Sequence, residues 1–260
     1  MGNVSSQSII LNFTKYSETS IIVNCYSLLN GYSSHIVKGV RSKKKSRFKL
    51  GHFQRLNLVE IENGNIRGNE LSYLKNIKII STYNSINSDV IKFNIAAFLS
   101  EILSMILKNH NADTKLFDFL KSSFEWFEKS ENYSSFHVLF MVYITKFLGI
   151  YPEKNINNHL FFDLENGCFS ENQDSTTCIS GQVTNDLSLI LGTQFDYSND
   201  VLYNVTRRRE MIDLMLKYYI IHLPGFKIPK SLEILNELLD RKSTRLNSSH
   251  SQQSRMPSSA

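Results

Sequence analysis

Residues 21–40 read IIVNCYSLLNGYSSHIVKGV, two apolar, β-rich runs on either side of Asn30-Gly31. Asn-Gly between two alternating apolar segments is a strong hairpin signal, because both residues tolerate the backbone angles of a tight turn. The stretch therefore predicts two antiparallel strands joined by that turn.

Three more strand-like segments surround this hairpin. Residues 8–15 (SIILNFTK) precede it, and residues 55–62 (RLNLVEIE) and 71–82 (LSYLKNIKIIST) follow it. Five short strands with Gly-containing turns between them predict a small barrel. An oligonucleotide/oligosaccharide-binding (OB) fold is the best fit, and an SH3-like barrel is the alternative.

The hydrophobic period changes after residue 83. Residues 88–108 (SDVIKFNIAAFLSEILSMILK) repeat apolar side chains every three or four positions, with Ser88 or Asp89 placed to cap a helix. The helical period recurs at 113–130, 133–148, 187–191, 206–223 and 230–239. The chain is thus predicted to be α+β: a five-stranded OB-fold barrel at 1–82, then a mostly α-helical domain at 83–240 with an irregular insert at 151–181, which includes a hairpin-like piece at 159–170.

The last twenty residues, 241–260, are different in kind. They read RKSTRLNSSHSQQSRMPSSA, without acidic residues or apolar periodicity. They look like a translated sequencing adapter, and a natural Ser-rich tail is the alternative. We expect a disordered, artefactual tail and exclude it from fold reasoning.

A basic segment, Ser34–Phe53 (SHIVKGVRSKKKSRFKLGHF), follows the predicted turn. It should form a long loop between two strands, because alternating segments flank it. Its cations could contact phosphates, and the rings of Phe48 and Phe53 could stack on bases. The alternative is a solvated loop without a partner. The predicted phosphate-binding cations are Lys38, Arg41, Lys43, Lys44, Lys45, Arg47 and Lys49.

Charge is divided unevenly along the chain. Residues 1–80 carry 12 basic and 4 acidic side chains, whereas residues 81–240 carry 13 basic and 20 acidic ones. A basic N-terminal part joined to an acidic body indicates that polyanion binding is concentrated at one end. A second basic cluster, Arg207–Arg209, is a candidate secondary contact, with ion pairing to Glu210 or Asp213 as the alternative.

No pattern in the sequence indicates catalysis or a metal site. The chain lacks a nucleophile elbow and a phosphate-binding loop. The three cysteines, Cys25, Cys168 and Cys178, have no Cys-x-x-Cys spacing, so neither zinc nor a disulfide framework is expected. Their number fits a reducing cytoplasm. No apolar run is long enough to span a bilayer. We expect a cytoplasmic protein that is not an enzyme, needs no cofactor and does not enter a membrane.

The order of several segments resembles the RecO family of bacterial recombination mediators, in the branch found in Bacteroidetes. The segments are SIILNFTKYSETSIIV (8–23), HIVKGVRSKKKS (35–46), FLSEILSMIL (98–107) and HLPGFKIPKSLEILNELL (222–239). This resemblance covers about residues 8–239. It implies an OB domain, a helical bundle and, in many members, a four-cysteine zinc ribbon, from which this chain departs because only Cys168 and Cys178 lie in that region.

The resemblance also implies a function and partners. RecO proteins bind single- and double-stranded DNA, anneal complementary strands and mediate recombination in the RecF pathway. Their partners are RecR, in some species RecF, and the C-terminal tail of single-stranded DNA-binding protein. We expect the same of this chain, with a nucleoid-associated location. Two alternatives remain open: an OB-fold RNA-binding protein, and an interaction scaffold that binds no nucleic acid.

Overall fold

The computed structural model describes residues 5–42, 47–63, 72–173, 175–191, 202 and 204–239. The chain separates into two compact units, residues 1–131 and 132–260, which are described one at a time. The first unit holds the barrel and the helices that follow it directly. The boundaries predicted from sequence, after residues 82 and 240, stay predictions.

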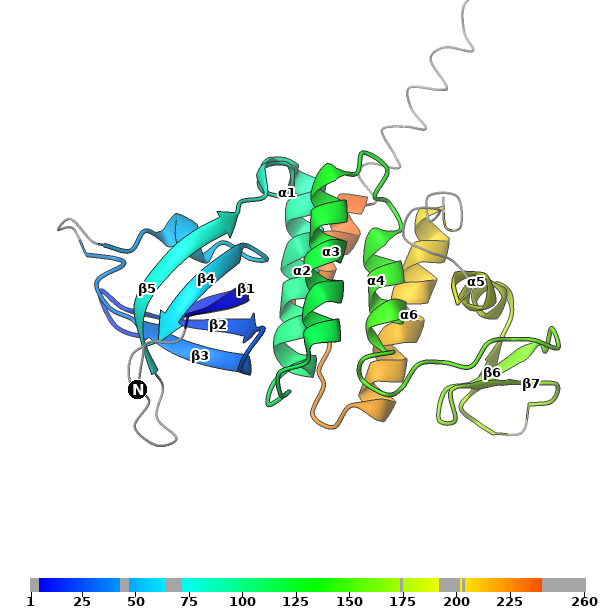
Figure 1. Ribbon diagram of the computed structural model, residues 1–260. Coiled ribbons are helices and arrows are strands. Elements are labelled where there is room, and N and C mark those ends of the chain that lie inside the picture. The colour runs from blue at the N-terminus through cyan, green and yellow to red at the C-terminus, as the bar shows by residue number, and fades with distance from the viewer. Residues whose placement is uncertain are drawn as a thin grey trace, which may run out of the picture. The chain divides into compact units, whose positions relative to one another are not determined.

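The first unit begins with a closed barrel of five strands (Figure 1). Around the barrel the order is β1-β2-β3-β5-β4, and β4 pairs again with β1. All neighbours are antiparallel except β3 and β5. This arrangement confirms the OB fold. The strands are β1 (Ser5–Lys15), β2 (Ile21–Ser27), β3 (Gly31–Val37), β4 (Leu58–Asn63) and β5 (Ser72–Ser81).

The hairpin predicted at Asn30-Gly31 joins β2 to β3. Ser27 pairs with Gly31, and the register continues without a shift to Ile21 opposite Val37. Gly31 has φ +68°, in the left-handed region that glycine enters without a Cβ penalty. A glycine is therefore required at this position by the turn itself.

His35 links the two parallel strands that close the barrel. Its Cα pairs with that of Ser72 across β3 and β5. The ring is buried, with Nδ1 2.6 Å from the Ser72 hydroxyl oxygen and Nε2 3.0 Å from that of Ser33. Burial lowers the pKa of His35 to about 4. The neutral imidazole is therefore the form that the folded barrel favours.

This pKa predicts a pH-dependent stability. In the unfolded state His35 becomes protonated below about pH 6.5, whereas in the folded state it stays neutral down to about pH 4. The free energy of unfolding therefore falls as the pH drops through this window. Between pH 7.5 and 5 the loss should be about 2 kcal/mol. Urea unfolding at several pH values measures it. His35→Gln should flatten the curve, and an unchanged slope in that variant would contradict the role of His35.

Helices follow the barrel in the first unit: α1 (Asn84–Ser88), α2 (Val90–Ile106) and α3 (Thr114–Lys129). Asp89 accepts hydrogen bonds from the backbone N–H of Ile91 and Lys92, which confirms it as the predicted cap of α2. Lys92 is buried and donates to the carbonyl oxygens of Glu128 and Ser130 at the end of α3. The last carbonyl groups of a helix point beyond its end, where donors from another element can satisfy them. Lys92 on α2 supplies such donors at the end of α3.

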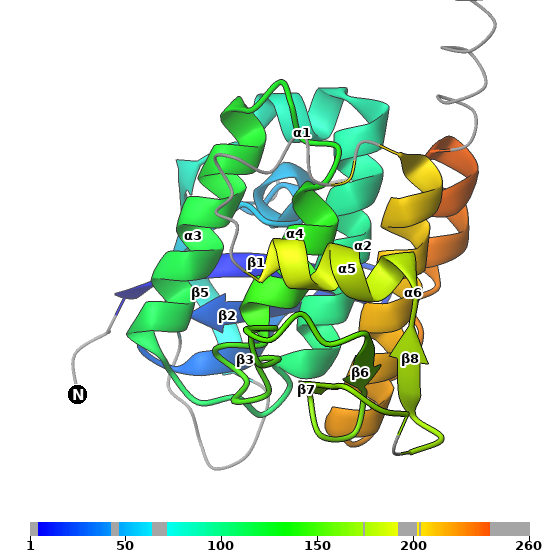
Figure 2. The ribbon, with the colours of Figure 1, turned by 90° about the vertical axis from the view of Figure 1, so that its right-hand side faces the viewer.

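The second unit contains helices and a small sheet (Figure 2). The predicted hairpin at 159–170 is present as β6 (Phe161–Asp163) and β7 (Cys168–Ser170). A third strand, β8 (Cys178–Ser180), pairs with the other edge of β6 and was not predicted. The helices are α4 (Phe136–Ile144), α5 (Gln182–Ile190), α6 (Val205–His222) and residues 231–239. The α+β class is confirmed. In the part of the chain that is described, no helix is long and apolar enough to cross a membrane.

Candidate nucleic-acid interface

The basic segment begins in β3 and continues as the connection between β3 and β4. Four of its seven cations are described, and all four side chains are exposed: Lys38, Arg41, Arg47 and Lys49. None of them forms an ion pair with another described residue. Their charge is therefore not neutralised by the described part of the chain. Lys43, Lys44 and Lys45 lie outside the described residues.

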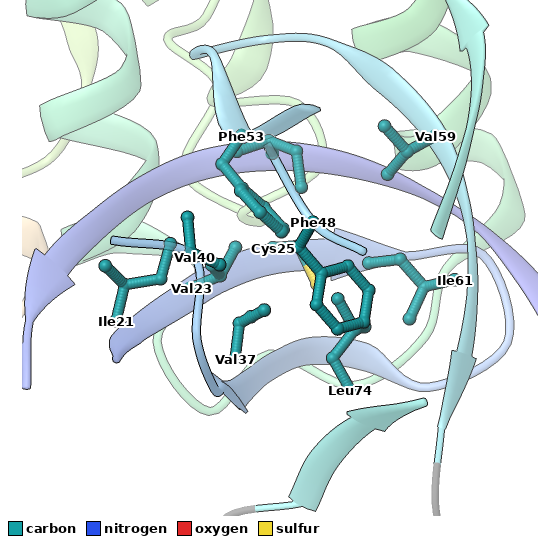
Figure 3. Close-up of a cluster of buried hydrophobic side chains, with 11 residues drawn as sticks. Ile21, Val23, Cys25, Val37, Val40, Phe48, Phe53, Val59, Ile61 and Leu74 are labelled. Carbon is teal, nitrogen blue, oxygen red and sulfur yellow. The ribbon is translucent and has the colours of Figure 1, made fainter. Parts of the chain in front are cut away.

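The two aromatic rings of the segment correct one prediction. Phe48 is 9% exposed and Phe53 is 0% exposed. Both point into the barrel, where their ring centroids are 6.5 Å apart among Val23, Val59 and other core residues (Figure 3). A ring surrounded by core side chains has no face free for a base. Phe48 and Phe53 thus anchor the segment instead of stacking on nucleic acid.

Hydrogen bonds to the backbone hold both described ends of the segment. At the first end, the Arg41 N–H donates to the Thr19 carbonyl oxygen at 3.1 Å. At the second end, η1, a short 3-10 helix (Leu50–Phe53), is held by the side-chain amide of Asn57, which donates to the Gly51 carbonyl oxygen at 3.2 Å. The exposed cations at these ends thus stand on a fixed backbone, which lowers the entropy cost of a phosphate contact.

The outer face of β1 and β2 is already occupied. The Asn12 amide on β1 donates to the Ser104 hydroxyl on α2 at 2.7 Å, and the Tyr26 hydroxyl on β2 donates to the Asn111 carbonyl oxygen at 3.0 Å. OB folds commonly bind oligonucleotides on the face of β2 and β3 and on adjoining loops. In this barrel, contacts with α2 and the residues after it cover part of that face. The described cations of the basic segment, in contrast, are exposed.

Arg207–Arg209 face the protein, which corrects the second predicted contact. Arg207 pairs with the fully buried Asp186 on α5, through Nε and Oδ2 at 2.8 Å and a second contact of its guanidinium. Arg208 is 6% exposed and donates to the Leu202 carbonyl oxygen at 2.6 Å; burial lowers its pKa. Arg209 donates to the Asn236 carbonyl oxygen at 3.1 Å. These bonds are internal, and Arg207 forms its ion pair with Asp186 on another helix.

Sequence reasoning missed Tyr73, which lies beside the basic segment. Its ring on β5 is 50% exposed, and the Lys38 ammonium lies 4.2 Å from the ring centroid. The signal was available in the alternation of Ser72, Tyr73, Leu74 and Lys75, which places the tyrosine on the outer face of its strand.

Fold and site together define the class: an OB-barrel protein with a cationic rim, continued by helices. Two family models match the chain, Recombination protein O N terminal at residues 1–83 and Recombination protein O C terminal at residues 87–233. The chain therefore belongs to the RecO family.

Curated relatives agree with this assignment. The DNA repair protein RecO of Christiangramia forsetii is 33% identical over 235 residues, which are 90% of this chain and 98% of the relative. The DNA repair protein RecO of Flavobacterium psychrophilum is 34% identical with the same coverage. That of Bacteroides fragilis is 32% identical over 89% of this chain and 97% of the relative. The predicted resemblance to the Bacteroidetes branch is confirmed.

The zinc ribbon implied by the family resemblance does not fit the residues present here. Cys168 on β7 and Cys178 on β8 pair with Asp163 from opposite sides of β6. The Asp163 carboxylate already accepts bonds from the Glu165 N–H and the Thr177 hydroxyl. A structural zinc takes four nitrogen or sulfur ligands. Among the residues with described positions, no cluster of three or more potential ligands is found. We assign no metal to this sheet.

Proposed function

We propose that this chain is a DNA repair protein that binds single- and double-stranded DNA through the basic segment and promotes strand annealing and recombination. The observation that carries the proposal is the set of exposed, unneutralised cations on an anchored loop of an OB barrel. Phosphate contacts release counterions and do not read sequence, so we expect little sequence preference.

Annealing follows from the same chemistry. Cations that hold two phosphate backbones lower the repulsion between the strands, and they leave the base edges free to pair. No covalent bond is made or broken in this process, which supports a mediator rather than an enzyme. A mixture of complementary labelled strands should pair faster with the protein than without it.

The first test is fluorescence anisotropy of a labelled single strand over a salt series. The variant Arg41→Gln/Arg47→Gln/Lys49→Gln removes three exposed cations of the described segment. Each lost phosphate contact should make the slope of log affinity against log salt shallower by about 0.7, and the affinity at 0.1 M salt should fall about 10- to 100-fold. Lys43→Ala/Lys44→Ala/Lys45→Ala tests three further cations of the segment in the same way.

The matched control removes three exposed lysines of the first unit that lie outside the basic segment, Lys108, Lys115 and Lys129. Lys108→Gln/Lys115→Gln/Lys129→Gln changes the net charge equally and should bind DNA almost as the wild type does. If both triple variants lost DNA affinity equally, binding would depend on net charge in general and not on a defined site. Absence of DNA binding in the wild type would reject the proposal, and binding to RNA alone would favour an RNA-binding protein.

We further propose RecR, RecF and the C-terminal tail of single-stranded DNA-binding protein as partners, on the support of family membership. DNA is the common ligand of such an assembly, so we place the protein at the nucleoid. Co-sedimentation of the purified proteins with and without DNA tests each pair separately. We assign DNA contact to residues 1–82 and expect the helical residues 83–240 to contribute the contacts with proteins.

A further inference from the structure

Tyr73 has an unusual position for a large aromatic side chain. It lies on β5 between Ser72 and Leu74, which are 8% and 7% exposed, whereas half of the Tyr73 side chain is exposed. The alternation of the strand therefore directs the ring outward from the barrel. Exposed rings are ordinary one at a time, so exposure alone does not make a site. The neighbours of the ring provide the second observation.

The Lys38 ammonium lies 4.2 Å from the centroid of the Tyr73 ring. Tyr73 pairs with Ile36 across the parallel strands β3 and β5, and Lys38 follows β3 directly. The hydrogen bond between Ser72 and His35 fixes the same strand pair one residue earlier. Ring and ammonium thus stand together on two paired strands of the barrel, where the chain leaves β3 for the cationic loop.

We propose that Tyr73 is the residue on which a base of single-stranded DNA stacks, with Lys38 contacting the adjacent phosphate. Every base has a π-face, so a ring beside a cation can accept any of the four. The ammonium of Lys38 ends a flexible four-carbon chain and can move from the ring to a phosphate when a base arrives. Phe48 and Phe53 do not compete for this role, because both are buried.

A stacking role of Tyr73 would make the protein prefer single-stranded over double-stranded DNA. In a duplex both faces of a base are stacked on its neighbours, so reaching Tyr73 requires unstacking, which costs a few kcal/mol. A single strand already offers unstacked bases. Phosphate contacts of the basic segment serve both forms of DNA, whereas Tyr73 favours the single strand. This inference rests on the proposed DNA binding and adds the group that distinguishes the two forms.

The experiment compares three ligands of equal length: a labelled single strand, the same strand made of abasic nucleotides, and the duplex. Tyr73→Thr removes the ring and keeps a residue that suits a strand. Its affinity for the base-bearing strand should fall about 5- to 140-fold, the effect of losing one stacked base. Its affinities for the abasic strand and the duplex should stay within about twofold of the wild type, and the salt slope should not change.

Three further variants test whether the effect is specific to the ring of Tyr73. Tyr73→Phe keeps the ring and should bind as the wild type does. Phe93→Ala removes another exposed ring of the first unit, on α2, and should have no effect. Lys38→Gln should weaken the binding of all three ligands. For the single strand, it should make the slope of log affinity against log salt shallower by about 0.7. Circular dichroism of each variant checks that the barrel is folded.

The outcomes separate this inference from the proposed function. Equal binding of the base-bearing strand by wild type and Tyr73→Thr overturns the stacking role while DNA binding stands. Equal losses on the base-bearing and abasic strands also overturn it, because the ring would then act on the backbone. A wild type that binds none of the ligands rejects DNA binding itself, and with it the role of Tyr73.

Discussion

Gly31→Ala is expected to destabilise the first unit by about 2–5 kcal/mol. Gly31 has φ +68°, a conformation that costs an L-residue about 1–2 kcal/mol. An added Cβ would lie 2.4 Å from the His110 carbonyl oxygen and 2.6 Å from the Ala112 nitrogen. Both are backbone atoms, which cannot turn aside as a side chain can, and overpacking adds typically about 1–3 kcal/mol.

Trp126, on α3, is the only tryptophan of the sequence, and it lies in the first unit. Its fluorescence during urea unfolding therefore measures this loss. The matched control is Gly51→Ala, since a Cβ at Gly51 meets no atom within 4 Å and its φ is not in the left-handed region. That variant should change the stability by less than about 1 kcal/mol. If the two alanine variants were equally stable, the close approach of the β2–β3 turn to residues 110–112 would be disproved.

Arg207→Leu should destabilise the second unit by about 3–5 kcal/mol. Asp186 is fully buried and accepts from the guanidinium of Arg207 and, at 2.8 Å, from the Gln182 amide. Removing the arginine leaves a buried carboxylate without its countercharge, and breaking such a pair typically costs this much. The free energy of opening of the α5 and α6 amides, from hydrogen exchange under native conditions, measures the effect.

The double variant Arg207→Leu/Asp186→Leu removes both charges and should regain most of the lost stability, because apolar residues of similar volume often replace a buried pair at little cost. Neither variant should alter the salt slope of DNA binding. If Arg207→Leu made the slope of log affinity against log salt shallower, Arg207 would contact DNA after all. A loss below about 1 kcal/mol would instead show that Asp186 stays solvated.

The strands could be predicted because each has one face in the buried interior of the barrel and one face on its outside. Alternation in residues 55–62 and 71–82, and Asn30-Gly31 between two apolar runs, follow directly from that asymmetry. Asp89 could be predicted as a cap because capping is local, extending only two or three residues along the chain. The three-residue strand β8 was missed because so short a segment shows no period.

The site was harder to predict because its side chains contact residues that are distant in the sequence. Phe48 and Phe53 stand among cations, and only the closed barrel brings Val59 and Ile61 around them. Arg207 was paired with neighbours on its own helix, whereas its partner Asp186 is 21 residues earlier. A single sequence fixes the type of a side chain but gives no direct sign of which distant residue will neutralise or cover it.

The contacts between the barrel and the residues that cover it also affect how the chain is made. Asn12 and Tyr26 bond to Ser104 and Asn111, which are 92 and 85 residues later in the sequence. At about 5–20 residues per second, a ribosome needs about 4–18 s to add them. During that interval β1 and β2 are present without their cover. The uncovered strands are then exposed to chaperones and to aggregation, and a slow codon between residues 27 and 104 would lengthen the exposure without changing the finished protein.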